Sequence, residues 1–212
     1  TLKTTARELV SDLSDEGVAS FQLRNYPDAV QLEEKKNVFL TSAFKDGLFE
    51  VQDASSQKIG ELLDVSDGMR VVDACAGAGG KTLHLAALMK NKGQIIALDI
   101  FEWKLAELKR RAKRAGAHNI ETRFIEDNKV IKRLHEKADR LLIDAPCSGL
   151  GVLKRNPDSK WKIDQDFIDR IKGEQQQILQ DYSKILKKGG QMIYATCSIL
   201  PSENNEQVKT FL

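Results

Sequence analysis

From about residue 66 onward, short apolar segments alternate with longer segments in which apolar residues recur at helical spacing. No other feature restricts the fold as strongly, because strands that alternate with helices favour a parallel sheet with right-handed crossovers. The segments with strand character are 70–73, 94–98, 120–125, 140–143 and 191–195. Helices are expected at 80–90, 101–115, 128–135 and 165–187. We therefore predict an α/β fold built on a doubly wound, mostly parallel sheet.

The longest predicted helix, 165–187, has most of its apolar residues on one face, which predicts packing against the sheet. It is followed by Gly189-Gly190. Glycine is favoured just past the end of a helix because it adopts a left-handed conformation at little cost. We therefore expect this glycine pair to terminate the helix.

The part of the chain before residue 66 shows a more varied pattern. Residues 4–13 are typical of an amphipathic helix that begins with a capping box formed by Thr5 and Glu8. Short strands are expected at 37–40 and 48–51. We expect a partial small α+β subdomain, a linking helix and a main domain, over residues 1–51, 52–65 and 66–212.

The composition limits the class of protein. With 212 residues, of which 41% are hydrophobic, the chain can build a sizeable core. Its 33 basic and 31 acidic residues leave a net charge of only +2, so any surface for nucleic acid has to be a local patch. Its three cysteines lack metal-type spacing, and no signal peptide or long apolar run is present. We expect a cytoplasmic protein with no disulfide framework, no metal and no membrane partner.

Open parallel sheets bind ligands at the carboxyl ends of their strands. The residues at these ends are Asp73, Asp99, Asp127, Asp144 and Thr196-Cys197. A single Asp at a strand end is usually a turn or capping residue. A carboxylate after four successive strands is more than capping requires, so the pattern predicts a cleft at this edge.

The first strand runs into a glycine loop and a helix, an arrangement that lets the backbone approach a ligand closely. The segment is Asp73-Ala-Cys-Ala-Gly-Ala-Gly-Gly-Lys-Thr82. It lacks the third glycine of a dinucleotide fingerprint, and it carries Cys75 where a phosphate-binding P-loop needs its first glycine. Asp99, roughly 20 positions beyond, suits the ribose hydroxyls of an adenosine nucleotide or of S-adenosylmethionine. A P-loop-like nucleotide hydrolase stays open as an alternative.

Two cysteines lie just past strands that should be neighbours, Cys147 after Asp144 and Cys197 after Thr196. A lone cysteine is usually a small buried apolar residue, and we keep that interpretation for Cys75. Two thiols beside one cleft suit methylation of cytosine, because a thiolate that adds to carbon 6 activates carbon 5. Asp144 could act as the acid near N3 if burial raises its pKa. Spacing alone does not assign the two thiols their roles.

Four segments resemble, in order and in spacing, the Sun/Fmu (RsmB-like) family of S-adenosylmethionine-dependent RNA 5-methylcytosine methyltransferases. They are 52–56, 73–82, 144–149 and 195–198. The resemblance spans nearly the whole chain and implies a class I (Rossmann-like) methyltransferase fold. It also implies that the chain begins inside the family's small RNA-binding subdomain and lacks the last strands of the sheet.

The resemblance implies that Cys197 is the nucleophile, that Cys147 assists release of the product, and that Lys81 contacts the reacting region or has a structural role. Asp144 completes the implied catalytic set. Ala78 stands where many members have proline, which leaves the loop less rigid. The residues implied to bind S-adenosylmethionine are Cys75, Ala76, Gly77, Ala78, Gly79, Gly80, Lys81, Asp99, Asp127 and Asp144.

The loop after Cys147 combines cations with an indole, which suits phosphate contact and base stacking on single-stranded RNA. The candidate RNA-binding residues are Lys154, Arg155, Lys160 and Trp161; a plain solvated loop is the alternative. The cations at 104–114 are expected to be mainly a solvated helix face. The target cytosine has to enter a pocket, so it is expected to be unpaired or flipped. We expect a monomeric enzyme acting on ribosomal RNA or tRNA; an RNA-binding module without catalysis is a further alternative.

Overall fold

The structure, a computed structural model, describes all residues from Thr1 to Leu212. Its centre is a five-stranded parallel sheet with the strand order β5-β4-β3-β6-β7. The strands are β3 (Arg70–Asp73), β4 (Gln94–Asp99), β5 (Ile120–Phe124), β6 (Ala138–Asp144) and β7 (Leu186–Ala195). The chain order reverses at β3, so β3 and β6 flank the point at which such sheets bind ligands. The predicted α/β fold with a doubly wound parallel sheet is confirmed.

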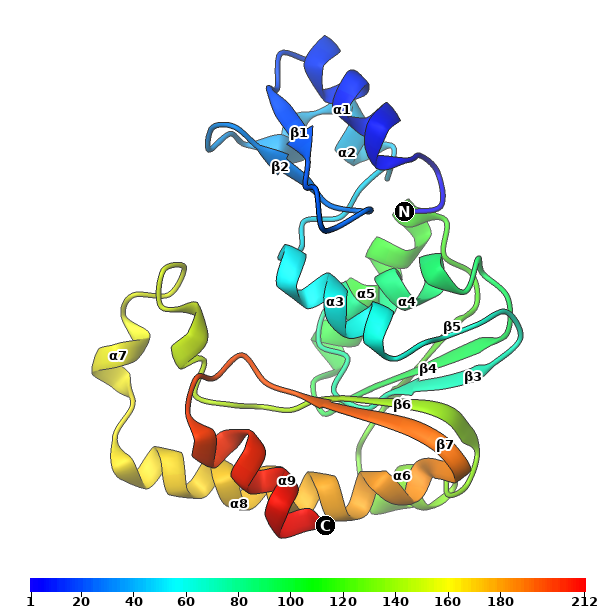
Figure 1. Cartoon of the computed structure of the whole chain (residues 1–212). Helices are drawn as coiled ribbons and strands as arrows, with labels where there is room; N and C mark the ends of the chain where they lie inside the picture. Colours follow the sequence, from blue (N-terminus) through cyan, green and yellow to red (C-terminus); the bar gives the residue numbers. More distant parts are fainter.

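Helices cover both faces of the sheet (Figure 1). One face carries α3 (Ala54–Leu62), α4 (Gly80–Leu88) and α5 (Glu102–Ala115), and the other carries α6 (Asn128–Lys132), α8 (Gln165–Tyr182) and α9 (Asn205–Phe211). Side chains of a strand alternate between these faces: Val71 belongs to the core under α4, and Val72 to the core under α6 and α8. The central strands are therefore buried on both sides. None of the helices has the length and apolar character needed to cross a membrane.

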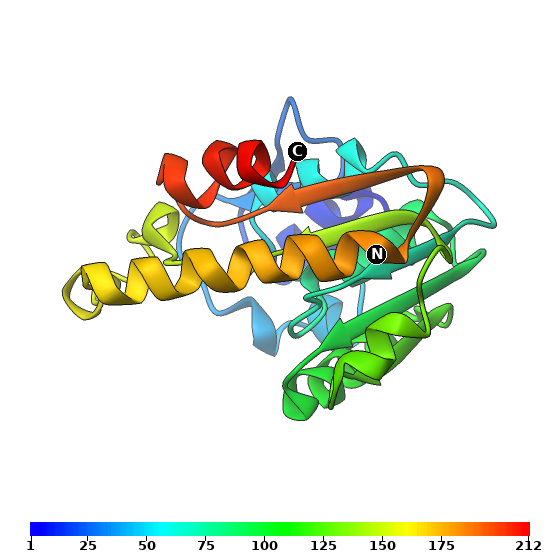
Figure 2. The ribbon, with the colours of Figure 1, turned by 90° about the horizontal axis from the view of Figure 1, so that it is seen from below.

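Helix α8 runs along the sheet with α9 beside it (Figure 2). It ends at Tyr182, and the 3-10 turn η3 (Ser183–Ile185) leads into β7. The prediction that Gly189-Gly190 terminate this helix is wrong, because both glycines lie inside β7. Residues 187–190 face only Asp139 of β6, so the glycines form a bulge. Gly189 has a φ of +77°, and a Cβ on Gly190 would lie 3.0 Å from the carbonyl oxygen of Asp139.

The N-terminal part forms a smaller layer with its own apolar core (Figure 1). Its elements are α1 (Ala6–Asp15), β1 (Ser20–Gln22), β2 (Val30–Leu32), the 3-10 turn η1 (Val38–Leu40) and α2 (Ser42–Lys45). Thr5 and Glu8 make the predicted capping box. The predicted strands at 37–40 and 48–51 are wrong. Asn37 caps η1 through the N–H of Phe39, and 48–51 has no regular structure. Val38, Leu48 and Phe49 pack in the core of this layer instead of pairing in a strand.

This N-terminal layer is attached to the sheet domain by charged groups of α5. Glu50 pairs with Arg111 and Arg114, whose side chains are only 15% and 21% exposed. Lys3 Nζ donates a hydrogen bond to the carbonyl oxygen of Arg114 at 2.7 Å. The expectation of a solvated face is therefore wrong for these two arginines, although Arg110 on the same helix is 75% exposed.

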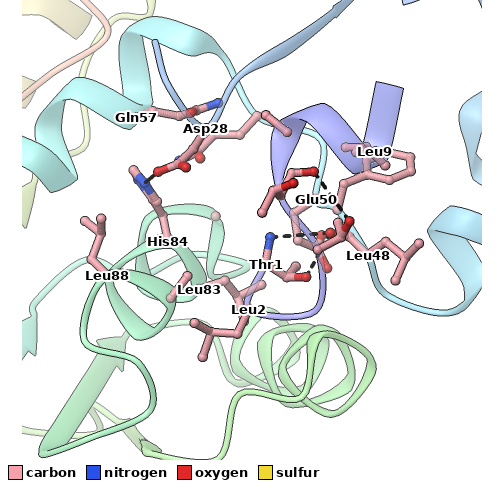
Figure 3. A pocket seen from close by; sticks show the side chains of 17 residues that line it. Thr1, Leu2, Leu9, Asp28, Leu48, Glu50, Gln57, Leu83, His84 and Leu88 are labelled. Atoms are coloured by element: carbon pink, nitrogen blue, oxygen red, sulfur yellow. Dashed lines mark hydrogen bonds and ion pairs between the residues drawn. The ribbon is translucent and has the colours of Figure 1, made fainter. Parts of the chain in front are cut away.

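A cavity of about 220 Å³ lies between the N-terminal layer and α4 (Figure 3). His84 of α4 lies in its wall, with Nε2 4.0 Å from Asp28 Oδ2. Burial lowers the pKa of His84. Gly80 is the one residue of the predicted site that lines this cavity, which lies apart from the carboxyl ends of the strands.

Candidate active site

Two cavities open at the carboxyl ends of the parallel strands, and Asp144 at the end of β6 lines both. The Asp99 cavity, named after the residue at the end of β4, has a volume of about 600 Å³. The Cys197 cavity, named after the residue beyond β7, has a volume of about 490 Å³. A ligand in one cavity would therefore share the Asp144 carboxylate with a ligand in the other.

The glycine loop between β3 and α4 is held close to Asp99. The N–H of Gly77 donates to Asp99 Oδ2 at 2.8 Å, and that of Phe101 donates to Oδ1 at 2.8 Å. Gly79, with a φ of +88°, is the N-cap of α4, and a Cβ there would lie 2.5 Å from Cγ of Leu108. The Asp99 carboxylate is thus fixed in orientation, and each oxygen keeps a lone pair for a ligand.

Asp73 lies beneath the glycine loop and does not line the cavities. It is 1% exposed and accepts a hydrogen bond from Thr82 Oγ1 at 2.7 Å. Burial raises the pKa of Asp73 to about 7, and its Oδ1 has no hydrogen-bond partner. Its position indicates that it supports the start of α4.

Most of the wall of the Asp99 cavity comes from residues that the sequence analysis did not select. Ile100 and Phe101 follow β4, and Ile125 follows β5. One face of α8 completes the wall with Glu174, Gln177, Ile178 and Tyr182. Their spacing of three, four and eight residues along a helix was the available signal, because it predicts a shared face.

Only four of the predicted cofactor-binding residues line the Asp99 cavity: Cys75, Gly77, Asp99 and Asp144. Ala76 is buried in the core under α5, and the carbonyl oxygen of Ala78 accepts a hydrogen bond from Arg111 at 2.7 Å. Asp127 is the N-cap of α6 and accepts a hydrogen bond from the N–H of Lys129 at 2.8 Å. Burial raises the pKa of Cys75, which makes it a poor nucleophile.

The two candidate catalytic thiols are in contact. The sulfur atoms of Cys147 and Cys197 lie 3.2 Å apart, and both cysteines are free. The N–H of Cys197 also donates to the sulfur of Cys147 at 3.3 Å. The contact arises because β6 and β7 are adjacent and parallel, so that the loops that follow them meet.

This contact makes the two thiols unequal. The hydrogen bond with Cys147 lowers the pKa of Cys197 to about 7, against the effect of partial burial. The same hydrogen bond raises the pKa of Cys147. Cys197 is the more exposed of the two and lines the Cys197 cavity. Because thiolates rather than thiols are nucleophilic, this difference favours Cys197 as the candidate nucleophile.

Lys81 and Asp144 form an ion pair beside this thiol. Lys81 Nζ lies 2.6 Å from Asp144 Oδ2, and both residues line the Cys197 cavity. Lys81 follows the glycine loop, whereas Asp144 ends β6. The ion pair therefore connects the glycine loop, which lies beside the Asp99 cavity, to the end of β6, which lies beside Cys197.

The outer part of the Cys197 cavity is bridged by Arg155, which forms an ion pair with Asp53, the N-cap of α3. Lys154 lines the same cavity. The other two candidate RNA-binding residues do not: Trp161 is 80% exposed, and Lys160 Nζ lies 4.8 Å from the centre of its ring. No group of three or more His, Cys, Asp or Glu side chains is arranged to hold a metal ion.

Comparison with known proteins gives related sequences. A family model described as 16S rRNA methyltransferase RsmB/F matches residues 61–212. The chain is 38% identical over 202 residues to ribosomal RNA small subunit methyltransferase B of Proteus mirabilis, covering 94% of this chain and 47% of that protein. It is 36% identical over 212 residues to the probable ribosomal RNA small subunit methyltransferase B of Bacillus subtilis, covering 100% of this chain and 47% of that protein. The chain spans about half the length of the curated relatives it matches.

Solved structures share the fold. A methyltransferase homolog protein from Pyrococcus horikoshii has a TM-score of 0.85 at 32% identity, covering 99% of this chain and 66% of that one. NSun6 from Pyrococcus horikoshii with SFG has a TM-score of 0.88 at 22% identity, covering 99% of this chain and 77% of that one. At that identity the second likeness is one of fold alone.

Proposed function

The chain belongs to the 16S rRNA methyltransferase RsmB/F family, and from this premise we propose that it transfers a methyl group from S-adenosylmethionine to carbon 5 of a cytosine in RNA. The predicted class I (Rossmann-like) methyltransferase fold is confirmed by the solved methyltransferase structure that it matches. Ribosomal RNA is the proposed substrate ahead of tRNA, because the curated relatives are named as ribosomal RNA methyltransferases.

One observation carries the proposal: the thiol pair of Cys147 and Cys197 lies beside Asp144, which also lines the Asp99 cavity. A nucleophile for the cytosine ring and a cavity for a methyl donor are thus adjacent. Neither a nucleotide hydrolase nor an inactive RNA-binding module has a use for a thiol of lowered pKa at this position.

The Asp99 cavity fits S-adenosylmethionine by the chemistry of its walls. The Asp99 carboxylate suits the two ribose hydroxyls, and Ile100, Phe101 and Ile125 offer apolar surface to the adenine. Membership of a methyltransferase family supports this assignment. The bound cofactor supplies an electrophilic methyl group on a sulfonium.

The proposed reaction begins when the Cys197 thiolate adds to carbon 6 of cytosine. A carbon–sulfur bond forms, the electrons of the ring double bonds shift towards N3, and Asp144 is the proposed proton donor to N3 in its neutral acid form, in which it is hydrogen-bonded rather than ion-paired with Lys81. Carbon 5 is then nucleophilic and takes the methyl group, the sulfonium leaves as a neutral thioether, and the proton on N3 returns to Asp144. A water molecule takes the proton from carbon 5 while the bond between carbon 6 and the Cys197 sulfur breaks, which restores the double bond and releases the Cys197 thiolate; Cys147 is proposed to assist this release. Lys81 holds Asp144 beside the reacting ring.

RNA is proposed to enter over Lys154 and Arg155, whose positive charges suit phosphate. Because Cys197 lines a cavity at the ends of the strands, we propose that the target cytosine is unpaired or flipped when it reaches the thiol. The exposed Trp161 is proposed to stack on a neighbouring base.

We also propose that the protein is a monomer in the cytoplasm, where free cysteines persist. Light scattering after gel filtration tests whether the protein is a monomer.

The roles of the two thiols are tested with a radiolabelled RNA on denaturing gels. We expect Cys197→Ala to give neither methylation nor a covalent RNA adduct, and Cys147→Ala to accumulate the adduct. If Cys147→Ala is inert and Cys197→Ala traps RNA, the two roles are exchanged.

A calorimetric titration separates the proposed enzyme from the nucleotide hydrolase. We expect binding of S-adenosylmethionine and no binding of ATP with Mg²⁺. The opposite result overturns the proposed function. RNA binding without methyl transfer by the unmodified protein, at saturating cofactor, would favour the inactive module.

A further inference from the structure

The contact between the two thiols depends on loops that are far apart in the sequence. Cys147 and Cys197 are separated by 50 positions, and no covalent bond joins them. A hydrogen bond between sulfurs is weak and falls off steeply with distance. The pairing of β6 with β7 brings the two loops together, and one further side chain fixes the residues next to the thiols.

Glu203 at the end of the 3-10 turn η4 (Pro201–Glu203) contacts both loops. Its carboxylate accepts hydrogen bonds from the N–H of Ser148 at 2.8 Å and from the hydroxyls of Ser148 and Ser198. Ser148 directly follows Cys147, and Ser198 directly follows Cys197. The two hydroxyl oxygens also lie 3.1 Å apart. One carboxylate therefore bridges the two residues next to the thiols.

A third segment fixes this carboxylate from behind. Gln175 of α8 is completely buried, and its Nε2 donates to Glu203 Oε1 at 3.1 Å and to the carbonyl oxygen of Pro146 at 2.9 Å. The hydroxyl of Tyr194 donates to the carbonyl oxygen of Glu203 at 2.9 Å. Both the carboxylate and the backbone of Glu203 are thus immobilised against β7 and α8.

Glu203 has a relative exposure of 0%, an environment that penalises a charged group. Burial alone would raise its pKa, but the hydrogen bonds from Ser148, Ser198 and Gln175 outweigh burial and lower it. An ionised carboxylate accepts all of these hydrogen bonds at once, whereas a glutamine amide would turn a donor towards one of them. A buried charge is costly unless its hydrogen-bond partners compensate the loss of water, and the partners of Glu203 provide that compensation.

We propose that Glu203 is a positioning residue whose carboxylate clamps Ser148 and Ser198 so that Cys147 can donate a hydrogen bond to the Cys197 thiolate. A role of this clamp in methyl transfer rests on the proposed function. Its effect on the hydrogen bond between the two thiols follows from the contacts alone. The other charged groups that face Cys197 across its cavity are Lys81, Asp144, Asp53, Lys154 and Arg155, and the clamp touches none of them.

The test measures alkylation of Cys197 by iodoacetamide as a function of pH, with mass spectrometry to separate the cysteines. The unmodified protein should show a midpoint of about 7. Glu203→Gln should move it up by about 1 to 1.5 units, towards the ordinary value for a thiol, and slow alkylation at pH 7 by about tenfold. The affinity of this variant for S-adenosylmethionine should not change. An unfolded variant would lose that binding, so the titration shows that the variant is folded. An unshifted midpoint in folded Glu203→Gln overturns the proposal.

The matched control is Glu206→Gln, three positions further along and exposed. It should leave the midpoint unchanged, and an equal shift in this variant also overturns the proposal. Should Glu203→Gln fail to fold, Ser148→Ala and Ser198→Ala replace it. Each removes one arm of the clamp and should raise the midpoint by about half a unit, and no shift in either overturns the clamp. Because iodoacetamide needs neither RNA nor methyl donor, a protein with these shifts but without methylation keeps the clamp and loses the proposed function.

Discussion

The two cavities at the edge of the sheet share Asp144 but are built in different ways. The Asp99 cavity is formed by strand ends, the glycine loop and one face of α8, and backbone N–H groups fix its carboxylate. The Cys197 cavity is lined by mostly polar residues from α3, α4 and the loops after β6 and β7, and side-chain pairs hold it together. The comparison indicates that the fold itself supplies the first cavity, whereas individual side chains supply the second. Substitutions in one cavity, at residues other than the shared Asp144, should leave the other cavity intact.

The largest expected effect is on the Asp99 side. Asp99→Ala removes the acceptor of two backbone hydrogen bonds and the proposed partner of the ribose. We expect binding of S-adenosylmethionine to weaken by about 100-fold, or roughly 3 kcal/mol, in calorimetry. The alkylation midpoint of Cys197 should stay where it is. A shifted midpoint would show that the two cavities are coupled.

On the Cys197 side, Cys147→Ala removes the hydrogen bond that lowers the pKa of Cys197 to about 7. Since the thiolate is the reactive form, alkylation rises with pH through the pKa. The midpoint should therefore move upwards, towards about 8.5, and the rate at pH 7 should fall by about tenfold. Cys147→Ser keeps a donor and should shift less. If Cys147→Ala instead impairs cofactor binding, the separation of the two cavities is wrong.

Asp73 gives the Asp99 side a pH dependence of its own. Its pKa, about 7 when folded, is above the unfolded value of about 3.9, so the folded state binds a proton more tightly. Stability contributed by this proton is present below about pH 4 and is lost as pH rises towards 7. Relative to the unmodified protein, Asp73→Asn should therefore gain stability between pH 5 and pH 8, by about 1–2 kcal/mol in urea unfolding. Equal pH profiles for the two proteins would contradict this assignment.

The smallest effect is expected for Arg155→Ala. Its ion pair with Asp53 is largely solvent-exposed, and such pairs contribute about 0–1 kcal/mol, so the melting temperature should hardly change. The KM for RNA should rise a few-fold, with a shallower dependence on salt, because one contact to phosphate is lost. Lys188→Ala, exposed near the start of β7 and outside the cavity, is the matched control. An equal effect for Lys188 would show that the loss at Arg155 reflects net charge rather than a contact at the cavity.

The sheet could be predicted because most of its strands are short, apolar and regularly spaced, and because β3, β4 and β6 each end in an aspartate. The end of α8 could not. Gly189-Gly190 after a helical pattern are typical of a helix end, but the burial of Ile185 and the bulge against Asp139 place them in a strand. In the N-terminal layer, Val38 belongs to a run that is typical of a strand, yet it packs in a core as part of a 3-10 turn.

The candidate site likewise has a part that the sequence predicts and a part that only the folded structure reveals. The meeting of Cys147 and Cys197 follows from adjacent parallel strands, so the sequence was sufficient. Glu203 could not be selected, because an acidic residue beyond a strand is ordinarily solvated and only its partners make burial acceptable. The pairing of Asp53 with Arg155 joins positions 102 residues apart and leaves no pattern in the sequence.

The place of β7 at the edge of the sheet has a consequence for the growing polypeptide. All residues that line the Asp99 cavity have been synthesised by Tyr182, before β7 begins. Cys197 appears later, and its thiol becomes acidic only when β7 has docked on β6 and brought Cys147 beside it. A nascent chain therefore has no thiol activated by this contact before β7 pairs with β6, and we expect the reactivity of Cys197 towards RNA and towards stray electrophiles to begin with that pairing.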